Sequence, residues 1–122
     1  MGKHVLVIED EPNIIEAISF ILSRDGWSVD THSNGHDAVD VVRGKNPDLV
    51  ILDVMLPGKS GYDILSELRE SEATQDLPVL MLTARGQTKD RELAQRIGVS
   101  RFMTKPFSNA EILEALRELV PQ

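Results

Sequence analysis

The chain has 122 residues, a formal net charge of −7, no cysteine and a hydrophobic content of 41%. This length suits one domain with a single core, and the lack of cysteine excludes disulfide and zinc–thiolate chemistry. The negative charge argues against direct binding to nucleic acid or to anionic membranes, whose phosphates attract Lys and Arg. Because the sequence has no apolar run long enough for a membrane span and no signal peptide, we expect a cytoplasmic protein without membrane contact.

The N-terminal part predicts a strand, a helix and a second strand. The apolar run Lys3–Ile8 is typical of a buried strand. Pro12 suits the first turn of a helix, where its missing N–H costs nothing, and Gly26 is placed to end that helix. Residues 27–31 alternate in polarity, which predicts a second strand toward an edge of the sheet.

The middle of the chain repeats this order. A short helix around Ala38, which we expect Gly44 and Pro47 to stop, leads to the apolar run 49–53. That run has no polar alternation, so it predicts a strand buried on both faces of a parallel sheet. A third helix is expected from near Gly61.

The C-terminal part adds two more strand–helix pairs. Residues 78–83 predict a fourth strand, and Thr88–Ile97 predicts a polar helix with few apolar anchors. A brief fifth strand over 101–104 precedes Ser108–Glu111, a capping box that opens the last helix. Alternation of strand and helix implies right-handed crossovers and a doubly wound α/β fold, with five parallel strands and helices on both faces.

Polar residues gather where the predicted strands end, namely Glu9, Asp10, Asp53, Thr83 and Lys105. The carboxyl ends of parallel strands meet at one edge of the sheet, where ligands bind in open α/β folds. Three carboxylates in one crevice repel each other unless a cation joins them or their pKa values rise. Oxygen ligands alone favour Mg²⁺, whereas zinc or copper would need His or Cys.

Lys105 adds a positive charge to this edge, and Thr83 adds a hydroxyl. A metal and a lysine beside a carboxylate can neutralise a transferring phosphoryl group, and an aspartate can itself accept that group. Each residue alone also has a plainer interpretation: Asp53 as a turn cap, Lys105 as a solvated lysine and Thr83 as a strand residue. The three histidines show no ligand spacing and are expected at the surface: His4, His32 and His36.

Four segments, in this order and spacing, resemble the receiver domain of bacterial two-component response regulators. They are Val7–Glu11, Asp53–Gly58, Leu82–Arg85 and Phe102–Phe107. The resemblance covers essentially the whole chain. Within the family, the chain is similar to the chemotaxis response regulator. It implies a single receiver domain over residues 1–122, with the flavodoxin-like strand order 2-1-3-4-5.

The resemblance also implies a Mg²⁺-dependent phosphoacceptor rather than an enzyme that turns over a substrate. Asp53 would accept a phosphoryl group from a sensor histidine kinase or a phosphotransfer protein. Asp10, Asp53 and the backbone carbonyl of Met55 would bind Mg²⁺, with Mn²⁺ as an alternative. Glu9 would assist the metal directly or through water.

Further residues take their roles from the same resemblance. Lys105 and Thr83 would each hold a phosphoryl oxygen; Thr83 would move toward the phosphoryl group, and Phe102 would then turn inward. Met55 and Arg85 stand at positions that influence the lifetime of the phosphoryl group, and Lys105-Pro106 resembles the cis peptide of the family. The face made by the fourth helix, fifth strand and fifth helix would control a downstream protein or a fused output domain, or pair two phosphorylated copies.

Three positions depart from the common pattern of the family. Glu9 stands where Asp is commoner, Phe102 replaces a frequent Tyr, and Lys59-Ser60 occupies a loop position that often carries Asp. Lys59 therefore places an extra cation near the expected site.

Two other functions share parts of this pattern. A small Mg²⁺-dependent phosphatase of the haloacid dehalogenase kind would carry a second Asp two residues after Asp53, but Met55 occupies that position. A flavin-binding module would need a phosphate-binding loop after the first strand, where Glu9–Glu11 would repel a phosphate.

Overall fold

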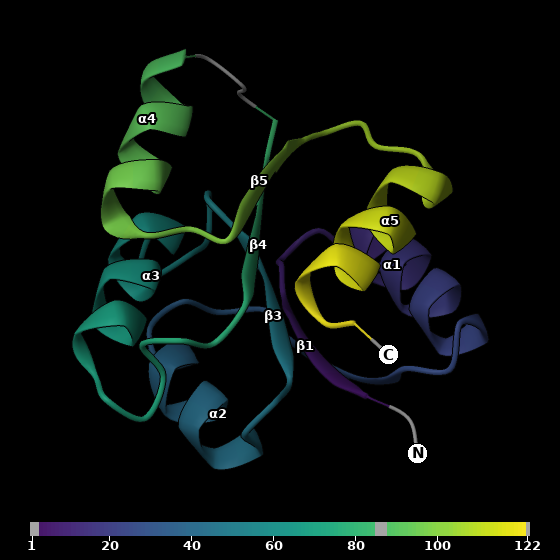
Figure 1. The fold of residues 1–122 in the computed structure, drawn as a ribbon, viewed down its shortest axis with the longest axis horizontal. Coiled ribbons are helices and arrows are strands. Elements are labelled where there is room, and N and C mark those ends of the chain that lie inside the picture. Colours follow the sequence, from purple (N-terminus) through teal and green to yellow (C-terminus); the bar gives the residue numbers. More distant parts are fainter. Residues whose placement is uncertain (1–2, 85–87, 122) are drawn as a thin grey trace.

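The computed structural model describes residues 3–84 and 88–121 of the chain. Its centre is a five-stranded parallel sheet in the order β2-β1-β3-β4-β5, drawn in Figure 1. The strands are β1 (His4–Ile8), β2 (Ser28–His32), β3 (Leu49–Asp53), β4 (Val79–Thr83) and β5 (Arg101–Thr104). The predicted fold class and strand order are therefore confirmed.

Helices cover both faces of this sheet. They are α1 (Pro12–Arg24), α2 (Ala38–Lys45), α3 (Gly61–Glu70), α4 (Thr88–Ile97) and α5 (Asn109–Leu119). Figure 1 shows α1 and α5 together on one face, and α2, α3 and α4 on the other. None of the helices in the described ranges is long and apolar enough to cross a membrane.

The apolar runs form strands because helices cover both of their faces. All five residues of β3 and all five of β4 are buried. Side chains of a strand point alternately to the two faces, so Val50 and Leu52 pack toward α2 and α3, whereas Leu49 and Ile51 pack toward α1 and α5. The less buried β2 lies at an edge of the sheet, as its polar alternation predicted.

Local signals placed most helix ends correctly, but Gly44 does not stop α2. Gly44 lies within the helix, which ends where Asn46 adopts the left-handed conformation with φ 49°. The Asn46 N–H closes the helix on the carbonyl of Val42. A glycine inside a helix costs only about 1 kcal/mol, whereas a left-handed residue ends it outright.

The other local predictions agree closely with the structure. Ser108 and Glu111 form the predicted capping box of α5, and Gly26 follows α1 with φ 94°. Lys105-Pro106 is a cis peptide. Trp27, expected to begin the second strand, instead lies in the core just before β2.

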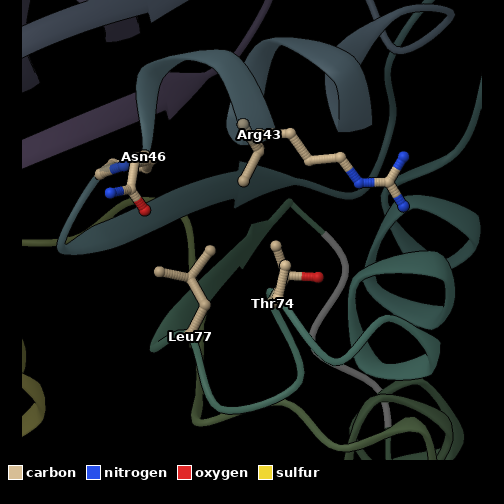
Figure 2. Close-up of a pocket in the computed structure, with 7 residues that line it drawn as sticks. Arg43, Asn46, Thr74 and Leu77 are labelled. Atoms are coloured by element: carbon tan, nitrogen blue, oxygen red, sulfur yellow. The ribbon is translucent and has the colours of Figure 1, made fainter.

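A small pocket of about 80 Å³ lies at the amino ends of β3 and β4. Figure 2 shows Arg43 and Asn46 on its α2 side and Thr74 and Leu77 across from them. The Thr74 hydroxyl donates to the carbonyl of Leu68 at 2.6 Å, so it serves the local fold. The pocket is at the opposite end of the sheet from the polar strand ends described next.

Candidate functional site

The parallel register brings the predicted polar residues to one edge of the sheet. Ile8 pairs with Leu52 in the neighbouring strand, Asp53 pairs with Leu82, and Thr83 pairs with Thr104. The strands β1, β3, β4 and β5 therefore end close together. The residues that follow or close these strands, listed by strand, are Glu9 and Asp10, Asp53, Thr83, and Lys105.

Three carboxylates form an acidic cluster at this edge: Glu9, Asp10 and Asp53. One oxygen from each lies within 4.8 Å of the others. Glu9 is fully buried and Asp53 is 3% exposed, whereas Asp10 faces solvent. The donor set is all oxygen and open on the Asp10 side, which fits a hard divalent cation such as Mg²⁺.

Lys105 reaches into the cluster from the segment after β5. Its Nζ lies 2.8 Å from Glu9 Oε1 and 3.3 Å from Asp53 Oδ1. Glu11, which belongs to the matching segment Val7–Glu11 but was given no role, also lies near, with its Oε1 3.7 Å from Lys105 Nζ. The ammonium group thus offsets part of the repulsion between two buried carboxylates.

The second oxygen of Glu9 is bonded to the backbone. Glu9 Oε2 accepts from the N–H of Asp10 at 3.0 Å and from the N–H of Glu11 at 3.2 Å. With Lys105 on the other oxygen, each oxygen of this carboxylate already has a partner. Glu9 therefore shapes the turn that presents Asp10 to the cluster.

The surroundings raise the pKa of both Asp53 and Lys105. Burial, followed by the charge of Glu9, raises the pKa of Asp53 to about 6, and Lys105 only partly opposes this rise. Burial acts to lower the pKa of Lys105, but its hydrogen bond with Glu9 and the charges of Asp53 and Glu9 outweigh that effect and raise it. The buried pair therefore favours a protonated Lys105 and, without a cation, makes ionisation of Asp53 costly.

Of the two expected switch residues, Thr83 closes β4 at the edge that holds the cluster, and Phe102 lies two residues before Thr104 in β5. Thr83 is buried at the end of β4, and its carbonyl accepts from the Lys105 N–H at 2.8 Å. Phe102 is half-buried on β5, with the Arg91 guanidinium 5.1 Å from its ring centre. Arg85 lies outside the described residues.

Two residues beside the site were expected to influence it. Met55 follows Asp53 in the loop and is 64% exposed. Lys59, expected as an extra cation near the site, instead forms an ion pair with Glu67 on α3.

The histidines are not part of the acidic cluster. His4 Nε2 lies 2.5 Å from Asp30, and His32 Nε2 lies 2.7 Å from Asp37. Both rings are partly buried, whereas His36 is exposed as expected. His4 thus pairs across β1 and β2, and His32 pairs with the residue that precedes α2; neither pairing could be seen from spacing alone.

A comparison with protein families identifies the chain. Residues 5–117 match the family model of the response regulator receiver domain. The chain belongs to this family. It is a receiver domain of a two-component system, consistent with phosphorylation-dependent signalling from histidine kinases, and receiver domains are phosphoacceptors rather than turnover enzymes.

Individual relatives agree with this assignment. A probable transcriptional regulatory protein, TcrX of Mycobacterium tuberculosis, is 42% identical over 95% of this chain and 49% of its own length. The receiver domain therefore spans about half of that relative. A putative response regulator from Chloroflexus aurantiacus superposes with a TM-score of 0.94 at 27% identity, covering all of both chains.

A further solved structure bears on the acidic cluster. The receiver domain of sensor histidine kinase PA1611 from Pseudomonas aeruginosa is 29% identical, with a TM-score of 0.91 and full coverage of both chains. That structure has a magnesium ion coordinated in its active-site cleft. In the present chain, the acidic cluster places one oxygen each of Glu9, Asp10 and Asp53 within 4.8 Å of one another, an arrangement that could hold a metal ion.

Proposed function

We propose that Asp53 accepts a phosphoryl group from a phosphohistidine on a sensor histidine kinase or a phosphotransfer protein. The observation that carries this proposal is a buried carboxylate with an ammonium 3.3 Å away, at the edge of the sheet where three carboxylates meet. An Asp53 oxygen attacks phosphorus as the bond to the imidazole nitrogen breaks, which forms an aspartyl phosphate.

We propose that Asp10, Asp53 and the backbone carbonyl of Met55 bind Mg²⁺, with Mn²⁺ as an alternative. Glu9 assists through water, because its two oxygens already accept hydrogen bonds from Lys105 and from backbone N–H groups. A bound divalent cation would offset negative charge on the phosphoryl oxygens. Lys105 and Thr83 donate to other phosphoryl oxygens, and Lys105 also stabilises the ionised form of Asp53.

We further propose that phosphorylation draws Thr83 toward the phosphoryl group and turns Phe102 inward. The thin anchoring of α4, in which Ala94 is the buried residue, supports a movable element next to β5. The face of α4, β5 and α5 then controls a downstream protein or a fused output domain, or pairs two copies of the chain. Residues 1–122 act as one receiver domain in the cytoplasm, and Met55 and Arg85 tune the lifetime of the phosphoryl group.

The test is intact mass after treatment with a small-molecule phosphodonor, with and without Mg²⁺. We expect the wild-type chain to gain one phosphoryl group only with Mg²⁺, and Asp53→Asn to gain none. Asp63→Asn, an exposed aspartate on α3, is the matched control and should label like the wild type. A wild type that stays unmodified under all conditions would rule out the phosphoacceptor role.

A turnover assay separates this proposal from a phosphatase. We expect no steady hydrolysis of a general phosphomonoester, because exposed Met55 replaces the second Asp that such phosphatases use. Continuous release of phosphate that depends on Asp53 would favour the phosphatase.

A further inference from the structure

Two loops at the carboxyl edge of the sheet are interlocked beside the acidic cluster. One is the β2–α2 loop, residues 33–37, and the other is the β3–α3 loop, residues 54–60. We infer that Gly35 is a positioning residue, which lets the β2–α2 loop hold the Glu9–Asp10 arm and the Asp53–Met55 arm of the metal site in place. This inference rests on the proposed Mg²⁺-dependent phosphoacceptor.

The first contact is between backbones. The N–H of Gly35 donates to the carbonyl of Pro57 at 2.9 Å. A Cβ at position 35 would lie 2.2 Å from the carbonyl oxygen of Lys59, which is far inside van der Waals contact. No side-chain rotation relieves this overlap, because the backbone fixes the position of the Cβ and the oxygen belongs to the backbone of Lys59. Any larger residue at position 35 must therefore push the β3–α3 loop away.

The opposite side of the interlock is also a glycine. Gly58 has φ +86°, and a Cβ there would lie 2.9 Å from Asn34 Oδ1 and 3.2 Å from the His36 nitrogen. That Asn34 oxygen accepts from the His36 N–H at 2.6 Å, which fixes the tip of the β2–α2 loop. Each loop thus places a glycine where the other loop approaches too closely for an added Cβ.

The same segment also holds the other arm of the site. The N–H of Glu9 donates to the carbonyl of His32, the last residue of β2, at 3.0 Å. Three residues later, Gly35 bonds to the β3–α3 loop. The short stretch from His32 to Gly35 therefore makes backbone hydrogen bonds to Glu9, in one arm of the metal site, and to Pro57, two residues beyond Met55 in the other loop.

Met55 lies between two fixed points of its loop. On one side, the N–H of Val54 donates to the carbonyl of Leu82 at 3.0 Å, and on the other Pro57 is bonded to Gly35. Beyond Pro57, the ion pair of Lys59 with Glu67 ties the loop to α3. A displacement at residues 57–59 therefore moves the Met55 carbonyl relative to Asp10.

The test compares Gly35→Ala with Gly44→Ala, whose added Cβ would meet nothing within 4 Å. Mg²⁺ affinity is measured by calorimetry, and folding by chemical denaturation in EDTA. We expect Gly35→Ala to weaken Mg²⁺ binding about tenfold or more, as the loss of support around metal ligands commonly does. We expect Gly44→Ala to bind Mg²⁺ like the wild type. A folded Gly35→Ala with wild-type Mg²⁺ affinity would overturn the inference.

A measurement on the wild type covers the case in which Gly35→Ala does not fold. Because the Gly35 N–H donates to the loop that carries Met55, Mg²⁺ should slow hydrogen exchange at this amide and leave the Gly44 amide unchanged. Equal exchange at Gly35 with and without Mg²⁺ would also overturn the inference. If the wild type binds no Mg²⁺ at all, the proposed metal site fails instead, so the two failures are distinct.

Discussion

At the scale of single residues, two buried carboxylates share one ammonium group in this site. Lys105 lies closer to Glu9 than to Asp53, at 2.8 Å against 3.3 Å. Glu9 is therefore the carboxylate more closely paired with Lys105, and it also accepts from two backbone N–H groups, whereas Asp53 has the longer contact and a raised pKa. That difference leaves Asp53 available to a cation and to a phosphoryl group.

The raised pKa of Asp53 predicts how stability changes with pH. A carboxyl with a folded-state pKa of about 6, against 3.8 ordinarily, binds a proton more tightly when folded. Its favourable contribution to the free energy of unfolding is thus fully present below about pH 4 and is lost as the pH rises through 6. We expect Asp53→Asn to raise the free energy of unfolding in EDTA by on the order of 2 kcal/mol at pH 7.5, and by much less at pH 4.

Urea denaturation at the two pH values, with circular dichroism as the readout, measures this difference. Asp63→Asn, on the exposed side of α3, serves as the control and should not change the pH dependence. If Asp53→Asn were less stable than the wild type at pH 7.5, ionised Asp53 would not lower the stability of the folded protein.

At the scale of elements, α4 is held by a few specific contacts rather than by a broad apolar face. Its N-terminal half meets α3 through Asp90 and Tyr62, and meets β5 through Arg91 and Phe102. Its C-terminal end is closed at Gly98, whose carbonyl accepts from Arg69 Nε at 2.7 Å. These contacts give two measurable predictions about how α4 is attached.

The first concerns Tyr62, the single tyrosine of the chain. Burial raises the pKa of Tyr62 above 10.0, and the charge of Asp90 and its hydrogen bond with the phenol add to this rise. We expect Asp90→Asn to lower the pKa of Tyr62, as followed by tyrosinate absorbance. Asp63→Asn, next to Tyr62 in sequence, should leave it unchanged. Identical titrations of Asp90→Asn and the wild type would mean that α4 does not contact α3 in this way.

The second concerns Arg69, which bonds to the segments before β4 and β5. Its guanidinium donates to the carbonyls of Gly98, Leu77 and Thr74 at 2.7, 2.8 and 3.2 Å. We expect Arg69→Met to lower the free energy of unfolding by about 2 kcal/mol, because three partly buried carbonyls lose their donor. Arg96→Met, an exposed arginine on α4, should change stability little. Equal denaturation midpoints for the two variants would contradict this role.

At the scale of the whole molecule, repulsion within the acidic cluster should link Mg²⁺ to stability. The chain carries a net charge of −7, and three of its carboxylates lie in one cluster. A cation that binds only the folded state stabilises it by about 2.7 kcal/mol at 100 times its dissociation constant. We expect Mg²⁺ to raise the thermal midpoint of the wild type and to have little effect on Asp10→Asn. An equal rise in both proteins would indicate general screening, which a titration with NaCl at matched ionic strength would reproduce.

The sequence predicts the architecture well because its signals are local. Apolar strands, caps and glycines lie within a few residues of the structure they produce, and the parallel arrangement then brings Asp10, Asp53 and Lys105 to one edge. The order of the strands came from family resemblance, since periodicity does not determine which strands are neighbours. Gly44 was misjudged because the stop signal of α2 lies two residues later, in the backbone conformation of Asn46.

The details that the sequence did not predict depend on contacts between distant segments. Glu11 lies near Lys105, and Gly35 lies against the backbone of Lys59, in each case because loops from different crossovers converge. A single sequence records no such pairing.

The most direct measurement is the position of the acyl phosphate in the chain. The wild-type protein is treated with a small phosphodonor and Mg²⁺, reduced with borohydride, which converts an aspartyl phosphate to homoserine, and then sequenced as peptides by mass spectrometry. We predict homoserine at position 53 alone, and none when Mg²⁺ is replaced by EDTA. Homoserine at another aspartate, or no conversion in a protein shown to bind Mg²⁺, would contradict the central claim that Asp53 carries the phosphoryl group.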